Sequence, residues 1–204
     1  MLSNSQLRAK ARNVLENNIF GNAWLMALVV CLISDLINGV ASSIPFASLI
    51  IAGPIAVGIS GVFLSTVRTG EAPKIEKMFD GFKDFVSNML LGLLIAVFTF
   101  LWSLLFIIPG IIKGYAYSMA YYIKVDHPEY DWKQCIKESQ EMMRGHKWRL
   151  FCLQFSFIGW ILLGMLACGI GLLWVAPYMT AANAEFYEDL KNNRIATYTE
   201  SEAN

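Results

Sequence analysis

Charged residues are scarce in this chain of 204 residues. They make up 16% of the sequence, against roughly 25% in ordinary soluble proteins. Hydrophobic residues make up 56%, and the mean hydropathy is +0.48. A soluble fold of this size needs more polar side chains to cover its surface, and the apolar content excludes a disordered chain. The composition therefore predicts a protein embedded in lipid.

The residues of common catalytic and metal sites are also sparse. The only histidines are His127 and His146, which are too few for a convincing zinc site. The chain has no HExxH, GxSxG, Walker-type loop or GxGxxG motif at the start of a helix. Its four cysteines include no CxxC pair, which argues against a disulfide framework or a metal cluster. We therefore expect no enzyme activity, no catalytic residue, no metal and no cofactor. The net charge of zero gives no reason to expect nucleic acid as a partner.

Apolar runs cover most of the chain. They lie at about 21–41, 44–66, 87–108, 110–124, 149–168 and 171–188. About 20 helical residues cross a hydrocarbon core of ~30 Å, and backbone groups in lipid must be hydrogen-bonded within the segment. The fourth run is short and contains Lys113, whereas the others meet or approach the required length. The runs predict an all-α, polytopic membrane bundle of six transmembrane helices.

The positions of the basic residues test this count, because cytoplasmic loops of membrane proteins are enriched in Lys and Arg. If the N-terminus is cytoplasmic and the chain crosses six times, all of the 16 Lys and Arg residues except Lys113 lie in the cytoplasm. Deleting the fourth span would move the cluster at 124–149 outside. We therefore predict a multi-pass protein of the cell (plasma) membrane with both termini in the cytoplasm. A cleaved signal peptide is the alternative at the N-terminus, and the long polar lead disfavours it.

An amphipathic stretch precedes each odd-numbered run. Its apolar residues recur every three or four positions, as on one face of a helix, and Asp131 with Gln134 resembles a capping box. The apolar positions are Leu7, Ala11, Val14 and Leu15; Ile75, Met78, Phe79 and Phe82; and Trp132, Cys135, Ile136, Ser139, Met142 and Met143. We predict three interfacial helices on the cytoplasmic side, which either contact anionic headgroups or only brace the bundle. The candidate headgroup contacts are Arg8, Lys10, Arg12, Lys74, Lys77, Lys83, Lys133, Lys137, Arg144, Lys147 and Arg149.

The end of each amphipathic stretch carries a glycine followed by an aromatic residue. These glycines are Gly21, Gly81 and Gly145. The pair of apolar runs that follows each glycine is also interrupted at a similar distance. Together these two features predict a threefold parallel internal repeat. The repeat units are about 1–66, 72–124 and 131–190. Together they form a single membrane domain, 1–190, and residues 191–204 are expected to be a disordered cytoplasmic tail.

A few polar and kinking residues inside the runs are candidate site residues. Asp35 is the one acid well inside a span, and Lys113 should lie near the same depth. Ionisable residues at such depth are costly, so we predict an Asp35–Lys113 ion pair; the alternative is that both side chains reach the outer headgroups. Pro54 and Pro177 predict helix kinks. Small residues in the second run favour close helix packing; they are Gly53, Ala56, Gly58 and Gly61.

Four segments carry a resemblance to known proteins, namely Phe79-Asp80-Gly81-Phe82, 106–123, 139–160 and 169–190. They resemble a bacterial family of integral membrane proteins known only as domain of unknown function 975. The resemblance covers about residues 1–190 and implies a polytopic bacterial membrane protein, with no established catalytic residue to carry over. A looser similarity exists to the membrane domain found ahead of some glycerophosphodiester phosphodiesterases, which is not their catalytic part.

Two functional hypotheses follow from these patterns. The first is a non-catalytic interaction or lipid-organising module, whose partners are membrane lipids with anionic headgroups, a protein partner or a second copy of the chain. The alternative is a small carrier or channel for a lipid, an amphipathic peptide or a small solute. A polar cavity that reaches the middle of the membrane favours the alternative, and a dry apolar centre excludes it within one protomer.

Overall fold

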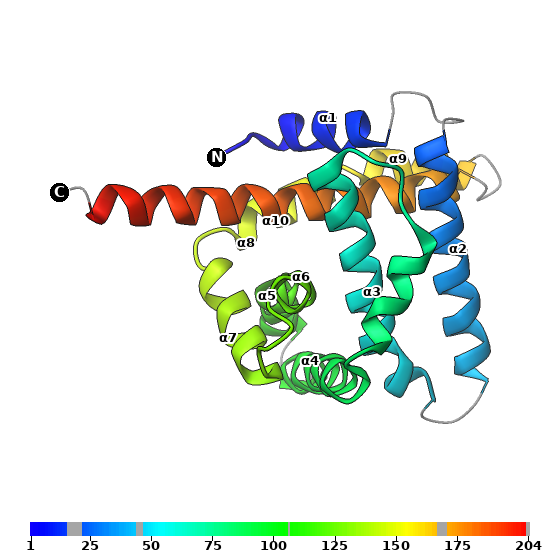
Figure 1. Cartoon of the computed structure of the whole chain (residues 1–204), viewed down its shortest axis with the longest axis horizontal. Helices are drawn as coiled ribbons and strands as arrows, with labels where there is room; N and C mark the ends of the chain where they lie inside the picture. Colours follow the sequence, from blue (N-terminus) through cyan, green and yellow to red (C-terminus); the bar gives the residue numbers. More distant parts are fainter. Residues whose placement is uncertain (16–21, 44–46, 106, 167–170, 203–204) are drawn as a thin grey trace.

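The structure, a computed structural model, describes residues 1–15, 22–43, 47–105, 107–166 and 171–202 (Figure 1). Within these residues the chain forms helices joined by turns and short loops, and no strand occurs. In chain order the helices are α1 (Asn4–Val14), α2 (Asn22–Ser42), α3 (Ala47–Thr69), the 3-10 helix η1 (Ile75–Phe82), α4 (Phe85–Leu105), α5 (Ile107–Tyr117), α6 (Ala120–Asp126), α7 (Trp132–Met142), α8 (Lys147–Phe155), α9 (Ile158–Leu166) and α10 (Leu172–Glu202). The predicted all-α class is confirmed.

Among the described residues, three helices are long and apolar enough to cross a membrane, namely α2, α3 and α4. They coincide with the first three predicted runs. In Figure 1, α2 and α3 stand upright, α10 lies across them, and α4 to α6 are seen end-on. The helices therefore do not share one axis, and the described residues support three of the six predicted spans by length and composition.

The fourth and fifth predicted spans are each divided between two shorter helices. The break between α5 and α6 falls at Ser118, whose hydroxyl donates to the Tyr115 carbonyl at 2.8 Å. The break between α8 and α9 falls at Ser156, whose hydroxyl donates to the Leu153 carbonyl at 2.6 Å. Such side chain–backbone bonds offer the chain an alternative to the helical hydrogen bonds. The hydropathy of the sequence does not fall at either break, so the apolar runs did not predict them.

The last helix, α10, continues through Glu202. The structure therefore does not show the predicted disorder over residues 191–202, and residues 203–204 lie outside the described part. Lys191 forms an ion pair with Asp126, and Arg194 forms one with Glu138 at 2.8 Å. These partners lie far away in the sequence, so the composition of the tail alone could not reveal them.

Two of the predicted amphipathic stretches, now α1 and α7, bury their apolar positions inside the protein. Leu7, Ala11 and Leu15 are fully buried, and α1 packs on α10. On α7, Cys135 and Ser139 are equally buried. The hydroxyl of Ser139 donates to the carbonyl of Ala116 at 2.8 Å, at the end of α5. The apolar faces of α1 and α7 therefore brace the bundle, while their basic residues lie on the outer side.

The start of α7 provides a direct test of the local structure. Asp131 and Gln134 form the predicted capping box, and the Asp131 carboxylate accepts the backbone N–H of Trp132 at 2.8 Å. Replacing an N-cap aspartate by alanine typically costs about 1 kcal/mol. We expect Asp131→Ala to lower the thermal unfolding temperature in nanodiscs by a few degrees. Lys137→Ala, an exposed change on the same helix, is the control and should leave it nearly unchanged.

Candidate functional site

The 3-10 helix η1 folds back along α3 instead of lying at one end of it. Its Met78 carbonyl faces Gly58, and its Gly81 faces the carbonyl of Pro54; a Cβ atom at Gly58 or Gly81 would lie 1.9 or 2.0 Å from these oxygens. Because a helix rises ~1.5 Å per residue, Pro54 lies roughly 20 Å from the Thr69 end of α3. In the structure this stretch is a 3-10 helix that packs along α3, and its interfacial position stays a prediction. Its backbone reaches the middle of an apolar helix, because glycines on both partners allow direct backbone contact.

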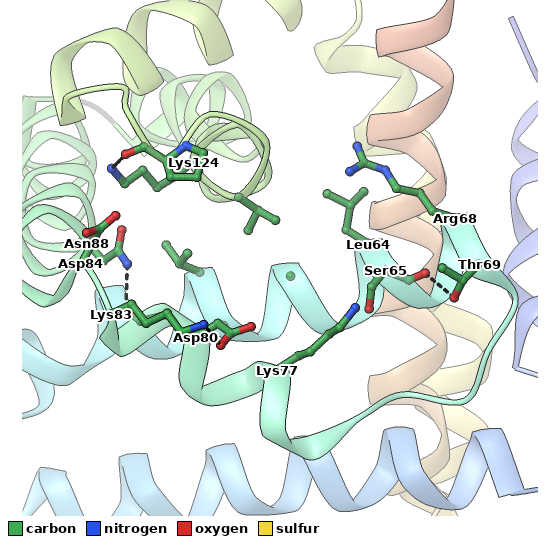
Figure 2. Close-up of a pocket in the computed structure, with 16 residues that line it drawn as sticks. Leu64, Ser65, Arg68, Thr69, Lys77, Asp80, Lys83, Asp84, Asn88 and Lys124 are labelled. Carbon is green, nitrogen blue, oxygen red and sulfur yellow. Dashed lines mark hydrogen bonds and ion pairs between the residues drawn. The ribbon is translucent and has the colours of Figure 1, made fainter.

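A pocket of about 480 Å³ lies between α3, η1, the start of α4 and the turn that follows α6 (Figure 2). Along α3 it extends from Val57 to Thr69, which corresponds to ~18 Å of helix. Its charged lining residues are Arg68, Lys77, Asp80, Lys83, Asp84 and Lys124. We call this the charged pocket. If α3 crosses a bilayer, the charged pocket extends over about half of a ~30 Å hydrocarbon core.

The charges around the pocket are not all neutralised within the protein. Lys83 pairs with Asp80 at 2.7 Å, whereas Lys77 and Asp84 form no ion pair with another described residue. Lys124 is only 4% exposed, and its ammonium donates to the carbonyls of Pro128 and Tyr130 at 2.6 and 2.9 Å. The Lys124 amine therefore contacts two backbone carbonyls and forms no ion pair with a described residue.

Asn88, in the first turns of α4, contributes an unsatisfied acceptor to the same pocket. The residue is 3% exposed, and its amide nitrogen donates to the Gly81 carbonyl at 2.7 Å. Because a carbonyl accepts only from a donor, this contact identifies the nitrogen and therefore also the oxygen of the amide. That oxygen, Oδ1, is buried and has no hydrogen-bond partner among the described residues. Unpaired buried polar atoms are uncommon and costly.

An ion-pair network joins α3, α6 and α10 behind the charged pocket. The side chain of Asp126 is 5% exposed and accepts two bonds from Arg68, at 2.7 and 2.8 Å, one from the Tyr187 hydroxyl at 2.9 Å and one from Lys191. Burial alone would raise the pKa of Asp126, but the bonds from Arg68, Lys191 and Tyr187 lower it to about 2. Asp126 is therefore ionised and holds the end of α3 against α10.

The predicted Asp35–Lys113 pair is not among the ion pairs of the described residues. Asp35 is exposed on α2, and the Lys113 ammonium lies 4.9 Å from the ring centroid of Trp102. α2 packs on α3 and α10, whereas α5 packs on α4, α7 and α8. The two residues thus lie on helices with different main packing partners. Pro54 and Pro177 are inside α3 and α10, and both helices continue through them.

The predicted headgroup contacts fall into two groups. Lys74, Lys83 and Arg149 pair with Glu71, Asp80 and Asp189. Most of the others are exposed and form no ion pair with a described residue; the exposed ones are Lys10, Arg12, Lys133, Lys137 and Arg144. Arg149 also donates to the carbonyl of Leu2 and lies 5.0 Å from the Phe186 ring. Arg149 therefore has a structural role, which the pattern of basic residues along the sequence did not predict.

Sequence reasoning missed Asn88, and it treated Lys124 as one more positive charge. Nothing in the sequence around Asn88 distinguishes it from a polar residue at the start of a span. Among the described residues, no group of three His, Cys, Asp or Glu side chains is arranged to hold a metal ion.

The family model for a protein of unknown function, DUF975, matches residues 1–113 and 104–194. The chain belongs to the DUF975 family. This confirms the resemblance seen in the sequence. No curated protein and no solved structure matches the chain, so the looser similarity to the membrane domain of glycerophosphodiester phosphodiesterases has no support here. Membership of DUF975 assigns no activity, and the function has to be argued from the charges and surfaces of the chain.

Proposed function

We propose that this DUF975 protein is a multi-pass membrane protein that organises lipids and catalyses no reaction. The apolar helices α2, α3 and α4 support insertion, and only 17% of the span in α4 is buried within the protein. The one-sided distribution of Lys and Arg supports six crossings, with α5–α6, α8–α9 and α10 completing the set and both termini in the cytoplasm. The order of a short helix followed by two apolar segments supports the three-unit repeat.

One surface feature carries the proposal. Trp148 is 72% exposed and stacks on Phe151 at a centroid distance of 5.1 Å. Beside it in the chain, Arg144 and Lys147 form no ion pair with another described residue. We call Arg144, Lys147 and Trp148 the basic–aromatic patch. An exposed tryptophan next to free cations is typical of the headgroup layer of a membrane, and the patch lies next to the bracing helix α7.

The test is lipid selectivity of the purified full-length protein. In mixed micelles, a pyrene-labelled phosphatidylglycerol should bind more tightly than the matching phosphatidylcholine, and high salt should reduce the difference. A basic residue near a membrane surface contributes about fivefold in affinity. The double variant Arg144→Gln/Lys147→Gln should therefore lose at least fivefold of the preference for phosphatidylglycerol.

The matched control is Lys74→Gln, because Lys74 is already neutralised by Glu71 at 2.7 Å. It should keep the preference for the anionic lipid. Equal binding of both lipids by the unmodified protein would refute the proposal. Size-exclusion chromatography and crosslinking of the same samples would show a homo-oligomer or a protein partner, which the basic–aromatic patch could also serve.

A second candidate function, a small carrier or channel, is favoured by the charged pocket. It lies along half the length of α3, and six of its 16 lining residues are charged. A smaller pocket of about 250 Å³ lies against α3, α6, α8 and α10 and is lined in part by Ser60, Gln154 and Asn183. Polar side chains therefore contribute to the lining of both pockets, which supports transport through one protomer.

A further inference from the structure

The smaller pocket, of about 250 Å³, has a different chemistry from the charged pocket. Ala56, Ile59 and Ser60 of α3 line it, and none of these three lines the charged pocket. None of its ten described lining residues carries a charge. We call it the neutral pocket. Whatever binds there has to be held by uncharged side chains.

Polar side chains reach the neutral pocket from four helices. They are Ser60 from α3, Tyr121 from α6, Gln154 from α8 and Asn183 from α10. The Tyr115 hydroxyl donates to Oε1 of Gln154 at 2.9 Å, so the Gln154 amide nitrogen is left as a donor. That nitrogen, the Tyr121 hydroxyl and the Asn183 side chain form no hydrogen bond with another described residue. The pocket wall therefore keeps both donors and acceptors for a molecule inside it.

The neutral pocket lies at the middle of α3. The central residue of Ala47–Thr69 is Gly58, and Ala56 and Ser60 are two residues away on either side, a rise of ~3 Å each. If α3 crosses a bilayer, this level is near the centre of the hydrocarbon core. An ion would lose its hydration there and find no opposite charge in the wall. A purely apolar molecule would leave the amide and hydroxyl groups of the wall without hydrogen bonds.

We propose that the neutral pocket binds a small uncharged polyol, a molecule of the size and chemistry of glycerol. A hydroxyl group both donates and accepts hydrogen bonds, so neighbouring hydroxyls of one short molecule match Tyr121, Gln154 and Asn183. The volume of about 250 Å³ is just below the roughly 300–1,000 Å³ of sites for drug-sized ligands, which suits a molecule of few heavy atoms. The inference rests on the second candidate function, a carrier or channel, and names its class of solute.

The experiment is saturation-transfer NMR of the full-length protein in phosphatidylcholine nanodiscs, with glycerol as the probe. We expect glycerol to bind at least about fivefold more tightly than glycerate, which has a similar size but carries a carboxylate. Asn183→Leu and Tyr121→Phe should each weaken glycerol binding about fivefold, the effect of one net hydrogen bond. Because neither side chain bonds to another described residue, both variants should unfold at about the temperature of the unmodified protein. Gln140→Leu, a polar-to-apolar change on α7 outside the pocket, is the matched control and should bind glycerol unchanged.

Flux is measured separately, as glycerol-driven swelling of proteoliposomes. Binding that both pocket variants weaken, without any flux, would support the site and refute the carrier function. Binding together with flux that falls in the same variants would support both. The proposal is overturned if glycerol does not bind, if glycerate binds equally well, or if glycerol binding survives Asn183→Leu and Tyr121→Phe. Flux that persists in both variants without specific binding would also overturn the site, while leaving transport by another route.

Discussion

Replacing Gly58 by alanine should destabilise the protein by about 3 kcal/mol or prevent it from accumulating in the membrane. The added Cβ would lie 1.9 Å from the Met78 carbonyl oxygen and 2.9 Å from its carbon. These are backbone atoms of η1, so they can move only if η1 moves away from α3. Overpacking of a rigid contact typically costs 1–3 kcal/mol, and separating two packed backbones belongs at the upper end. The measurement is thermal unfolding in nanodiscs, together with the amount of folded protein in membranes.

The matched control lies three residues further along the same helix. A Cβ at Gly61 would be 3.6 Å from the nearest atom, a methyl group of Val125, which is an ordinary contact. Gly61→Ala should therefore be neutral or stabilising by up to about 1 kcal/mol, because alanine is the better helix former. If Gly58→Ala and Gly61→Ala unfold at the same temperature, the close contact between α3 and η1 does not exist.

The contact at Gly58 also shows how far the sequence could predict this fold. The helical class, the first three apolar helices, the capping box at Asp131 and the small residues of α3 all follow from composition and from spacing along the chain. Each of these features depends on neighbours within a few residues. The sequence also predicted that η1 would be short and amphipathic, but not that it turns back along α3. That path depends on the pairing of Gly58 with Met78 and of Pro54 with Gly81.

The candidate site was harder to predict for the same reason. Lys77 and Lys83 were recognised as cations, but Asp80 neutralises only Lys83, and no spacing rule distinguishes the two lysines. The side-chain oxygen of Asn88 is left as an acceptor because the amide nitrogen of the same side chain already donates to the Gly81 carbonyl. The helical continuation of α10 through Lys191 and Arg194 likewise depends on Asp126 and Glu138, which are more than 50 residues away. Long-range polar pairing was therefore the information that the sequence pattern did not contain.

Asp126→Asn should strongly destabilise the protein. The change removes the charge that Arg68 and Lys191 share while keeping the size of the side chain and an acceptor for the Tyr187 hydroxyl. Removing one partner of a buried ion pair commonly costs 3–5 kcal/mol. Because Arg68 retains Glu188 at 2.6 Å, we expect about 3 kcal/mol. Glu129→Gln is the control: this exposed carboxylate pairs with His127 in the same turn, and its loss should cost little.

The pH dependence separates the charge of Asp126 from its shape. Its pKa in the folded protein is about 2, below the ~3.9 of an unfolded chain. The carboxylate therefore stabilises the fold fully above pH ~4 to 5 and loses this contribution as the pH falls towards 2. The unfolding temperature in nanodiscs should fall between pH 6 and pH 3 for the unmodified protein. Asp126→Asn should start lower and fall less over the same range, because it has no proton to gain there. Parallel curves for the two proteins would show that Asp126 does not hold α3, α6 and α10 together through its charge.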